Sequence, residues 1–143
     1  MLIICYGNPL RGDDGLGWHA AGMLREALPR ADVMNVHQLT PELAEECSQA
    51  ELAIFVDAAE AGVPGEWRYR EVRAKDASGE TFTHHVTPAG LLTAAGTLYG
   101  RAPRALLYTM TGESFEVSEG LSETIAAALP EMLAAVCRAA GRA

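Results

Sequence analysis

The stretch that decides the fold of this chain reads LIICYGNPLRGDDGLG, at residues 2–17. Residues 2–6 form an uninterrupted and partly β-branched apolar run, which is typical of a strand buried on both faces. Residues 15–28 then place their apolar side chains on one face of a helix. We therefore expect a strand, a glycine-rich loop and a helix, which together begin an α/β fold. Ligands of such folds usually bind at the carboxyl ends of the strands.

The composition of the glycine-rich loop indicates which ligand it favours. Gly7 and Gly12 have the spacing of a P-loop, but Asp13 and Asp14 stand where a P-loop carries Lys and then Ser or Thr. The later glycines also reverse the order of the dinucleotide-binding pattern. Two carboxylates repel a phosphate, so the loop favours a cation over a nucleotide. The alternative is that both aspartates only stabilise the start of the following helix.

Length and composition are those of a small globular protein. The chain has 143 residues, 49% of them hydrophobic, and a net charge of −8. This length predicts a single domain over residues 1–143. The acidic balance without a basic stripe argues against a nucleic-acid partner. No apolar run reaches the roughly 18 residues of a membrane helix, so we expect no membrane partner. Three widely spaced cysteines without a C-x-x-C motif are typical of reduced thiols, so we expect a cytoplasmic protein. We also expect a monomer, because the predicted helices and sheet account for most apolar runs without a partner.

The remaining patterns alternate between strands and helices. Further strands are expected at residues 32–39, 52–56, 66–72 and 105–110. Helices are expected to begin at the two Thr-Pro pairs at 40–41 and 87–88, and to span residues 121–140. The order β-α-β-α-β-β-α-β-α predicts a three-layer α/β/α fold with a mostly parallel, twisted five-stranded sheet flanked by helices on both faces. Residues 66–72 have two dissimilar faces, as in an edge or antiparallel strand.

Three ligand-type residues occupy comparable positions in this pattern. Asp14 follows the first strand, Asp57 ends the third strand, and His85 precedes the helix that leads to the last strand. Two carboxylates and one imidazole suit a divalent metal such as Ni²⁺ or Zn²⁺, and three ligands leave coordination positions open for substrate. The competing interpretations are a loop-capping role for Asp57 and a structural role for the histidine.

Three motifs resemble those of the [NiFe]-hydrogenase maturation proteases. They are GNPLRGDDGLG at residues 7–17, FVDA at 55–58 and THHVTP at 83–88, and the likeness runs almost from end to end. The resemblance implies that Asp14, Asp57 and His85 are both the catalytic and the metal-binding residues. His84, which is adjacent, is the alternative ligand to His85.

The resemblance also implies an activity. Such enzymes are endopeptidases that remove a C-terminal peptide from the hydrogenase large-subunit precursor after nickel insertion. The nickel carried by the substrate is the recognised metal, with zinc or cadmium as its substitutes in crystals. The resemblance thus implies a substrate-borne metal and a protein partner. The alternative is a non-catalytic, nickel-dependent binding or scaffold protein for hydrogenase assembly.

The catalytic mechanism is less defined by the sequence. No G-x-S-x-G or H-E-x-x-H motif is present. Our hypothesis is Lewis-acid catalysis, in which the metal polarises the scissile carbonyl or activates a bound water. Asp13, or Asp14 once released from the metal, would take the proton. For Asp13, a role as helix N-cap is the favoured alternative.

Overall fold

A computed structural model describes residues 1–77 and 86–141, and a five-stranded sheet forms its centre. The strands are β1 (Leu2–Tyr6), β2 (Asp32–Val36), β3 (Leu52–Ala59), β4 (Trp67–Val72) and β5 (Arg104–Thr111). Their spatial order is β2-β1-β3-β5-β4. Four strands are parallel, and β4 runs antiparallel to β5 at one edge. The predicted fold class is therefore confirmed, including the edge position of the strand with two dissimilar faces.

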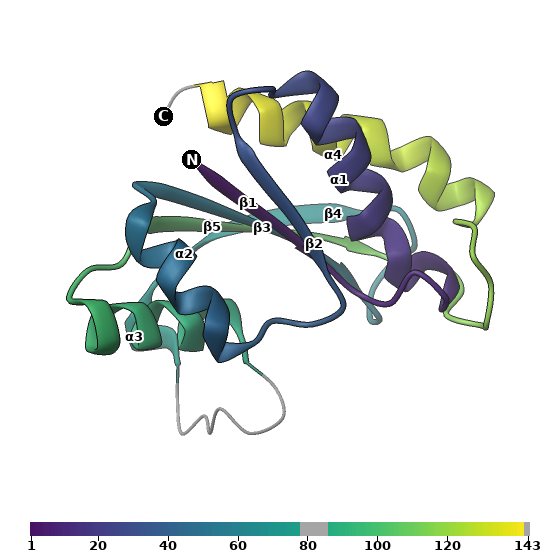
Figure 1. Cartoon of the computed structure of the whole chain (residues 1–143). Coiled ribbons are helices and arrows are strands. Elements are labelled where there is room, and N and C mark those ends of the chain that lie inside the picture. Colours follow the sequence, from purple (N-terminus) through teal and green to yellow (C-terminus); the bar gives the residue numbers. More distant parts are fainter. Residues whose placement is uncertain (78–85, 142–143) are drawn as a thin grey trace.

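Helices cover both faces of the sheet. They are α1 (Leu16–Ala27), α2 (Ala44–Gln49), α3 (Pro88–Tyr99) and α4 (Glu123–Gly141). Figure 1 shows α1 and α4 on one face and α2 and α3 on the other. The described residues also form short 3₁₀ turns at Gly12–Gly15 (η1), Pro41–Leu43 (η2) and Ala74–Asp76 (η3).

The two faces are built by the alternation of side chains along the central strands. Ile54 and Val56 of β3 belong to the core under α1 and α4. Phe55, which lies between them, belongs to the core under α2 and α3. Both cores exclude water from the sheet, so the central strands are apolar on both faces. In the central strands β1 and β3, polar side chains lie toward the carboxyl end, and this is where a site can form.

The predicted helix boundaries are largely confirmed. The Thr87 side chain accepts a hydrogen bond from Gly90 N at 3.1 Å, and Gly100 ends α3 with a φ of 79°. Ser122 accepts a bond from Ile125 N at 3.4 Å at the start of α4. The expected cap at Thr40 is different, because its side chain makes no cap bond and the segment begins with the η2 turn.

Two strand ends differ from prediction. Strand β2 ends at Val36, not at residue 39, and β3 continues to Ala59, so Asp57 lies within the strand and does not end it. The reason is that β5 is also longer than expected. It pairs Asp57 with Thr109 and Ala59 with Thr111, which continues the ladder past the polar residue.

By length and composition, α4 is the one helix in the described ranges that could cross a membrane. Its apolar residues nevertheless form one face, and Ile125, Leu129, Leu133 and Val136 are buried in the core shared with α1. This is the predicted core face of the C-terminal helix. The apolar composition of α4 is therefore explained by its packing on the sheet.

Candidate active site

The glycine-rich loop holds the carboxylate of Asp14 in a fixed place. The Asn8 backbone N–H donates to Asp14 Oδ2 at 2.7 Å, and Asn8 Oδ1 accepts from Leu10 N at 2.9 Å. Gly7 has a φ of 144°, and a Cβ there would lie 2.1 Å from the carbonyl oxygen of Asp14. Only glycine permits this close approach. The loop is therefore shaped around Asp14, and Asn8 acts as a turn residue.

Trp18, in the first turn of α1, joins this loop to β2. Its indole Nε1 donates to Gly7 O at 2.9 Å and to Val36 O at 3.2 Å. Its ring also meets the ring of His37 edge to face, with centroids 5.3 Å apart. This role could not be predicted from the sequence, because both acceptors are backbone carbonyls of distant segments.

Asp57 is half-buried beside the end of β1. Its Oδ1 accepts from Ala58 N at 2.8 Å, and the Tyr6 hydroxyl also hydrogen-bonds to its carboxylate. Burial, together with the negative charge of Asp14, raises the pKa of Asp57 to about 7, because the two hydrogen bonds offset these effects only in part. The two carboxylates are thus close enough to repel each other. A bound cation would relieve that repulsion.

Tyr6 is a site residue that the sequence pattern did not identify. Burial and the adjacent Asp57 raise the pKa of Tyr6 well above 10, so its hydroxyl stays protonated and can donate to the carboxylate. Its position at the end of a strand could have identified Tyr6 as a site residue. Tyr6 is the last residue of β1, and Cys5 pairs with Val56, so Tyr6 stands next to Asp57 in the sheet.

Asp13 has a different role from either of those expected. It is 0% exposed, and its side chain makes no cap bond to η1 or α1. Its carboxylate instead accepts from Glu113 N, Ser114 N, and both the N–H and the hydroxyl of Ser122, at 2.8–2.9 Å. Burial opposes ionisation, but these bonds outweigh it and lower the pKa of Asp13. Asp13 therefore connects the first loop to the segment before α4, and both of its carboxylate oxygens already accept hydrogen bonds.

The third predicted ligand, His85, and its alternative His84 lie outside the described residues. Within residues 1–77 and 86–141, no group of three His, Cys, Asp or Glu side chains is placed to hold a metal. The described chain resumes at Val86, which packs against the core under α2 and α3. By alternation with Phe55, Asp57 projects toward that same face. The structure thus brings Asp14 and Asp57 together and leaves the histidine a prediction.

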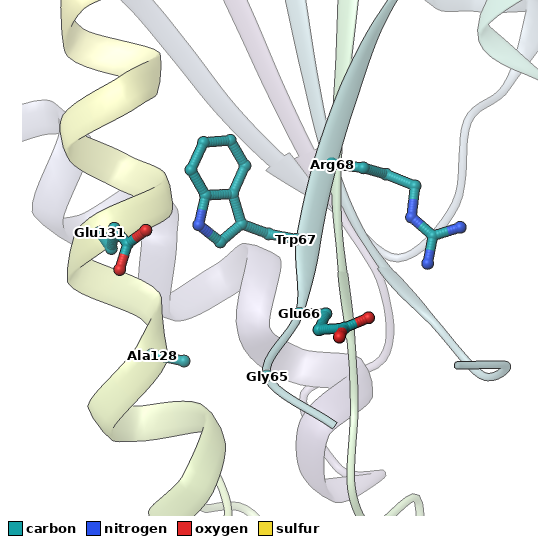
Figure 2. A pocket seen from close by; sticks show the side chains of 6 residues that line it. All are labelled: Gly65, Glu66, Trp67, Arg68, Ala128 and Glu131. Atoms are coloured by element: carbon teal, nitrogen blue, oxygen red, sulfur yellow. The ribbon is translucent and has the colours of Figure 1, made fainter. Parts of the chain in front are cut away.

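A cavity of about 430 Å³ lies elsewhere, between β4 and α4. Figure 2 shows its lining, with Trp67 projecting toward α4. The lining residues are Gly65, Glu66, Trp67, Arg68, Ala128 and Glu131. None of the predicted site residues is among them, and the cavity opens beside the α1/α4 core, whereas Asp57 projects to the other face.

Comparison with solved structures identifies proteins of the same fold. The chain superimposes on the hydrogenase maturating endopeptidase HybD of Escherichia coli with a TM-score of 0.75 and 22% identity, over 94% of this chain and 88% of that one. A hydrogenase 2 maturation peptidase from a Thaumarchaeota archaeon gives a TM-score of 0.72 and 27% identity, over 98% and 97% of the two chains. The [NiFe] hydrogenase maturation protease HycI of Thermococcus kodakarensis gives 0.75 and 22%, over 96% and 89%.

No family model matches the sequence, and no curated protein matches it. The relationship is therefore visible in the motifs and in the fold. The structural matches confirm the resemblance to hydrogenase maturation proteases that the motifs indicated.

Proposed function

We propose that this chain is an endopeptidase that removes a C-terminal peptide from the large-subunit precursor of a [NiFe] hydrogenase after nickel insertion. The observation that carries the proposal is that the carboxylates of Asp14 and Asp57 lie close together at the carboxyl edge of the sheet. The chain shares its fold with proteins described as hydrogenase maturation peptidases. Fold alone does not specify an activity, so the paired carboxylates are the decisive feature.

Recognition of the substrate would depend on its nickel. Asp14 and Asp57 supply two oxygen ligands, and His85 is proposed as the nitrogen ligand. Because the pKa of Asp57 is raised to about 7, part of this carboxyl is protonated near neutral pH. Binding of the cation requires the ionised form, so it would release a proton. A precursor without nickel gains no such coordination, so it would bind more weakly than the nickel-loaded precursor.

Hydrolysis would use the same metal as Lewis acid toward the scissile carbonyl or an attacking water. The base is then assigned by elimination between two aspartates. Asp13 is unsuited because its oxygens already accept four hydrogen bonds. Asp14 Oδ1, in contrast, has no hydrogen-bond partner among the described residues. We therefore assign proton transfer to Asp14, once it is released from the metal.

The proposed setting is the cytoplasm, with the chain acting as a monomer on one precursor molecule. Cys5, Cys47 and Cys137 are free, which suits a reducing compartment. Burial raises the pKa of the Cys5 and Cys47 thiols to about 12, so neither is a nucleophile near neutral pH.

The test is the intact mass of the precursor from the same organism after incubation with this protein, with and without bound nickel. We expect loss of a C-terminal peptide only from the nickel-loaded precursor. Asp57→Asn should reduce cleavage at least 100-fold. Glu60→Gln, which changes an exposed acid just beyond β3, is the matched control and should cleave like the wild type.

The other outcomes separate the alternatives. A stable complex with nickel-loaded precursor but no mass loss would overturn the peptidase assignment in favour of a scaffold. Cleavage without nickel would retain the peptidase and overturn recognition through the metal. Full activity in Asp57→Asn would remove Asp57 from the mechanism.

A further inference from the structure

A second cavity, of about 380 Å³, lies along the edge strand β4. Its lining residues are Arg68, Tyr69, Arg70, Leu107 and Thr109. Arg68 pairs with Thr109 and Arg70 with Leu107 in the antiparallel β4–β5 ladder. Leu107 belongs to the core under α2 and α3, so this cavity opens on the face toward which Asp57 projects. It is a separate cavity from the one beside α4, although Arg68 borders both.

Strand register connects this cavity directly to Asp57. Thr109 pairs with Asp57 on one side and with Arg68 on the other. Paired residues of neighbouring strands project to the same face, so the three side chains form one row across the sheet. The row begins at a carboxylate of the candidate active site and ends at a guanidinium.

Both arginines of the cavity are available to bind an anion. Within residues 1–77 and 86–141, the salt bridges formed by arginines involve Arg73 and Arg104, which both contact Glu71. Neither Arg68 nor Arg70 has such a partner there, and both are exposed. The cavity thus carries two unneutralised cations in a chain whose net charge is −8.

The positions of the two guanidinium groups direct them toward the site. Figure 2 shows Arg68 projecting to the side of β4 opposite Trp67, away from α4. Gly62 lies in the loop after β3, and Arg68 Nη2 is 3.3 Å from the position that a Cβ would occupy at this glycine. The charge of Arg70 acts on the hydroxyl of Tyr6, the group that donates to Asp57. Both cations are therefore close to the carboxyl edge of the sheet.

We propose that this cavity is a subsite that binds a carboxylate of the peptide segment removed from the substrate. The proposal rests on the proposed peptidase function. A guanidinium group donates two parallel hydrogen bonds to a carboxylate, and the Thr109 hydroxyl supplies a further donor. An acidic chain repels an acidic peptide, and the two arginines reverse that effect locally. A dianion such as phosphate fits less well, because Asp14 and Asp57 lie on the same edge.

The distance across the sheet sets the place of this carboxylate in the peptide. Neighbouring strands are about 4.8 Å apart, so β4 is roughly 10 Å from β3. An extended peptide advances about 3.3 Å per residue. The anionic group should therefore follow the scissile bond by about three residues. It is either an acidic side chain or the terminal carboxylate of a short segment.

A binding experiment tests the subsite without any cleavage. The probes are acetyl-Ala-Ala-Ala with a free carboxylate, the same peptide as its C-terminal amide, and acetyl-Ala-Asp-Ala-amide. Binding is followed by NMR of the backbone amide resonances of β4 and β5, which are present in every variant. We expect the free tripeptide or the aspartyl peptide to bind at least 10-fold more tightly than the neutral amide. The tighter of the two identifies the source of the carboxylate.

Variants then connect binding to the two arginines. Arg68→Gln combined with Arg70→Gln should weaken carboxylate binding at least 10-fold, as loss of charge-assisted hydrogen bonds predicts. Arg104→Gln, an exposed arginine at the other end of β5, is the matched control and should change it less than twofold. If the double variant unfolds, the single Arg70→Gln and Arg68→Lys variants replace it. Equal binding of the neutral amide, or unchanged binding in folded variants, would overturn the proposal.

Processing of the nickel-loaded precursor provides the second readout. The arginine variants should raise KM about 10-fold with kcat within twofold of wild type. A fall in kcat alone would overturn a role in substrate binding. A third result is that neither the wild type nor any variant cleaves the precursor while carboxylate binding still depends on the arginines. That result would overturn the peptidase function and retain the carboxylate-binding subsite.

Discussion

Asp13 and Ser122 are 109 residues apart in sequence, yet the Asp13 carboxylate accepts hydrogen bonds from both the backbone N–H and the hydroxyl of Ser122, each at 2.8 Å. The same carboxylate accepts from Glu113 N and Ser114 N. This one side chain therefore joins the loop that holds Asp14 to the segment that begins α4. It thereby fixes one side of the candidate active site.

Replacement of Asp13 should destabilise the whole fold. Asp13→Asn removes the charge and turns an amide donor toward groups that are themselves donors, which leaves buried N–H groups unpaired. We expect the free energy of unfolding to fall by about 2–4 kcal/mol in urea denaturation. Ser122→Ala should cost only about 1 kcal/mol, since the other bonds to Asp13 remain. A double variant that loses the full sum of both costs would contradict the coupling of the two side chains.

The raised pKa of Asp57 predicts a pH dependence of stability in the metal-free protein. The folded-state pKa of about 7 lies above 3.8, the ordinary value for an Asp side chain, so the folded state holds one more proton between these pH values. Stability from this group is complete below about pH 4 and is lost as the pH rises through 7. From pH 5 to 8, wild type should lose about 1–2 kcal/mol more than Asp57→Asn, with allowance for solvent screening.

The measurement is urea denaturation of both proteins at pH 5, 6, 7 and 8 in the presence of a chelator. Asp13 does not interfere, because its pKa is lowered from 3.8 and its contribution is lost only in more acidic solution. Parallel stability profiles for wild type and Asp57→Asn would show that Asp57 ionises normally in the folded state.

Gly7 should tolerate no side chain. Its φ of 144° disfavours any L-residue, and a Cβ would clash with the Asp14 carbonyl oxygen at 2.1 Å. Gly7→Ala should therefore lower the free energy of unfolding by about 1–3 kcal/mol and displace Asp14, with loss of precursor processing. Gly22→Ala is the control, because this glycine of α1 has open space around it. It should raise stability by roughly 0.5–1 kcal/mol and leave processing unchanged.

Replacement of Trp18 should reduce precursor processing more than replacement of Trp67, a tryptophan of similar exposure. Trp18→Phe retains an aromatic ring but removes the donor to Gly7 O and Val36 O. We expect a loss of about 1–2 kcal/mol in unfolding free energy and at least a fivefold loss in processing rate. Trp67→Phe, on the α4 side of β4, should affect stability alone. Equal processing by both variants would refute the role of Trp18 in holding the loop.

Local pattern was sufficient to predict most of the fold. The apolar runs at residues 2–6 and 52–56 predicted buried parallel strands, and the Thr87-Pro88 pair predicted the start of α3. These signals are local because burial and helix capping act on consecutive residues. The expectation that Asp14 and Asp57 lie together was also within reach, since both follow apolar strand segments at one edge of the sheet.

The sequence by itself thus determined the layers, the strand pattern and the location of the acidic site. Only the tertiary structure decided that Asp13 binds the segment before α4, that Tyr6 donates to Asp57, and that Asp57 lies inside a longer strand. The physical reason is that hydrophobic periodicity is set by near neighbours along the chain. A hydrogen bond or a shifted pKa depends on groups brought close by folding, which no spacing of residues specifies.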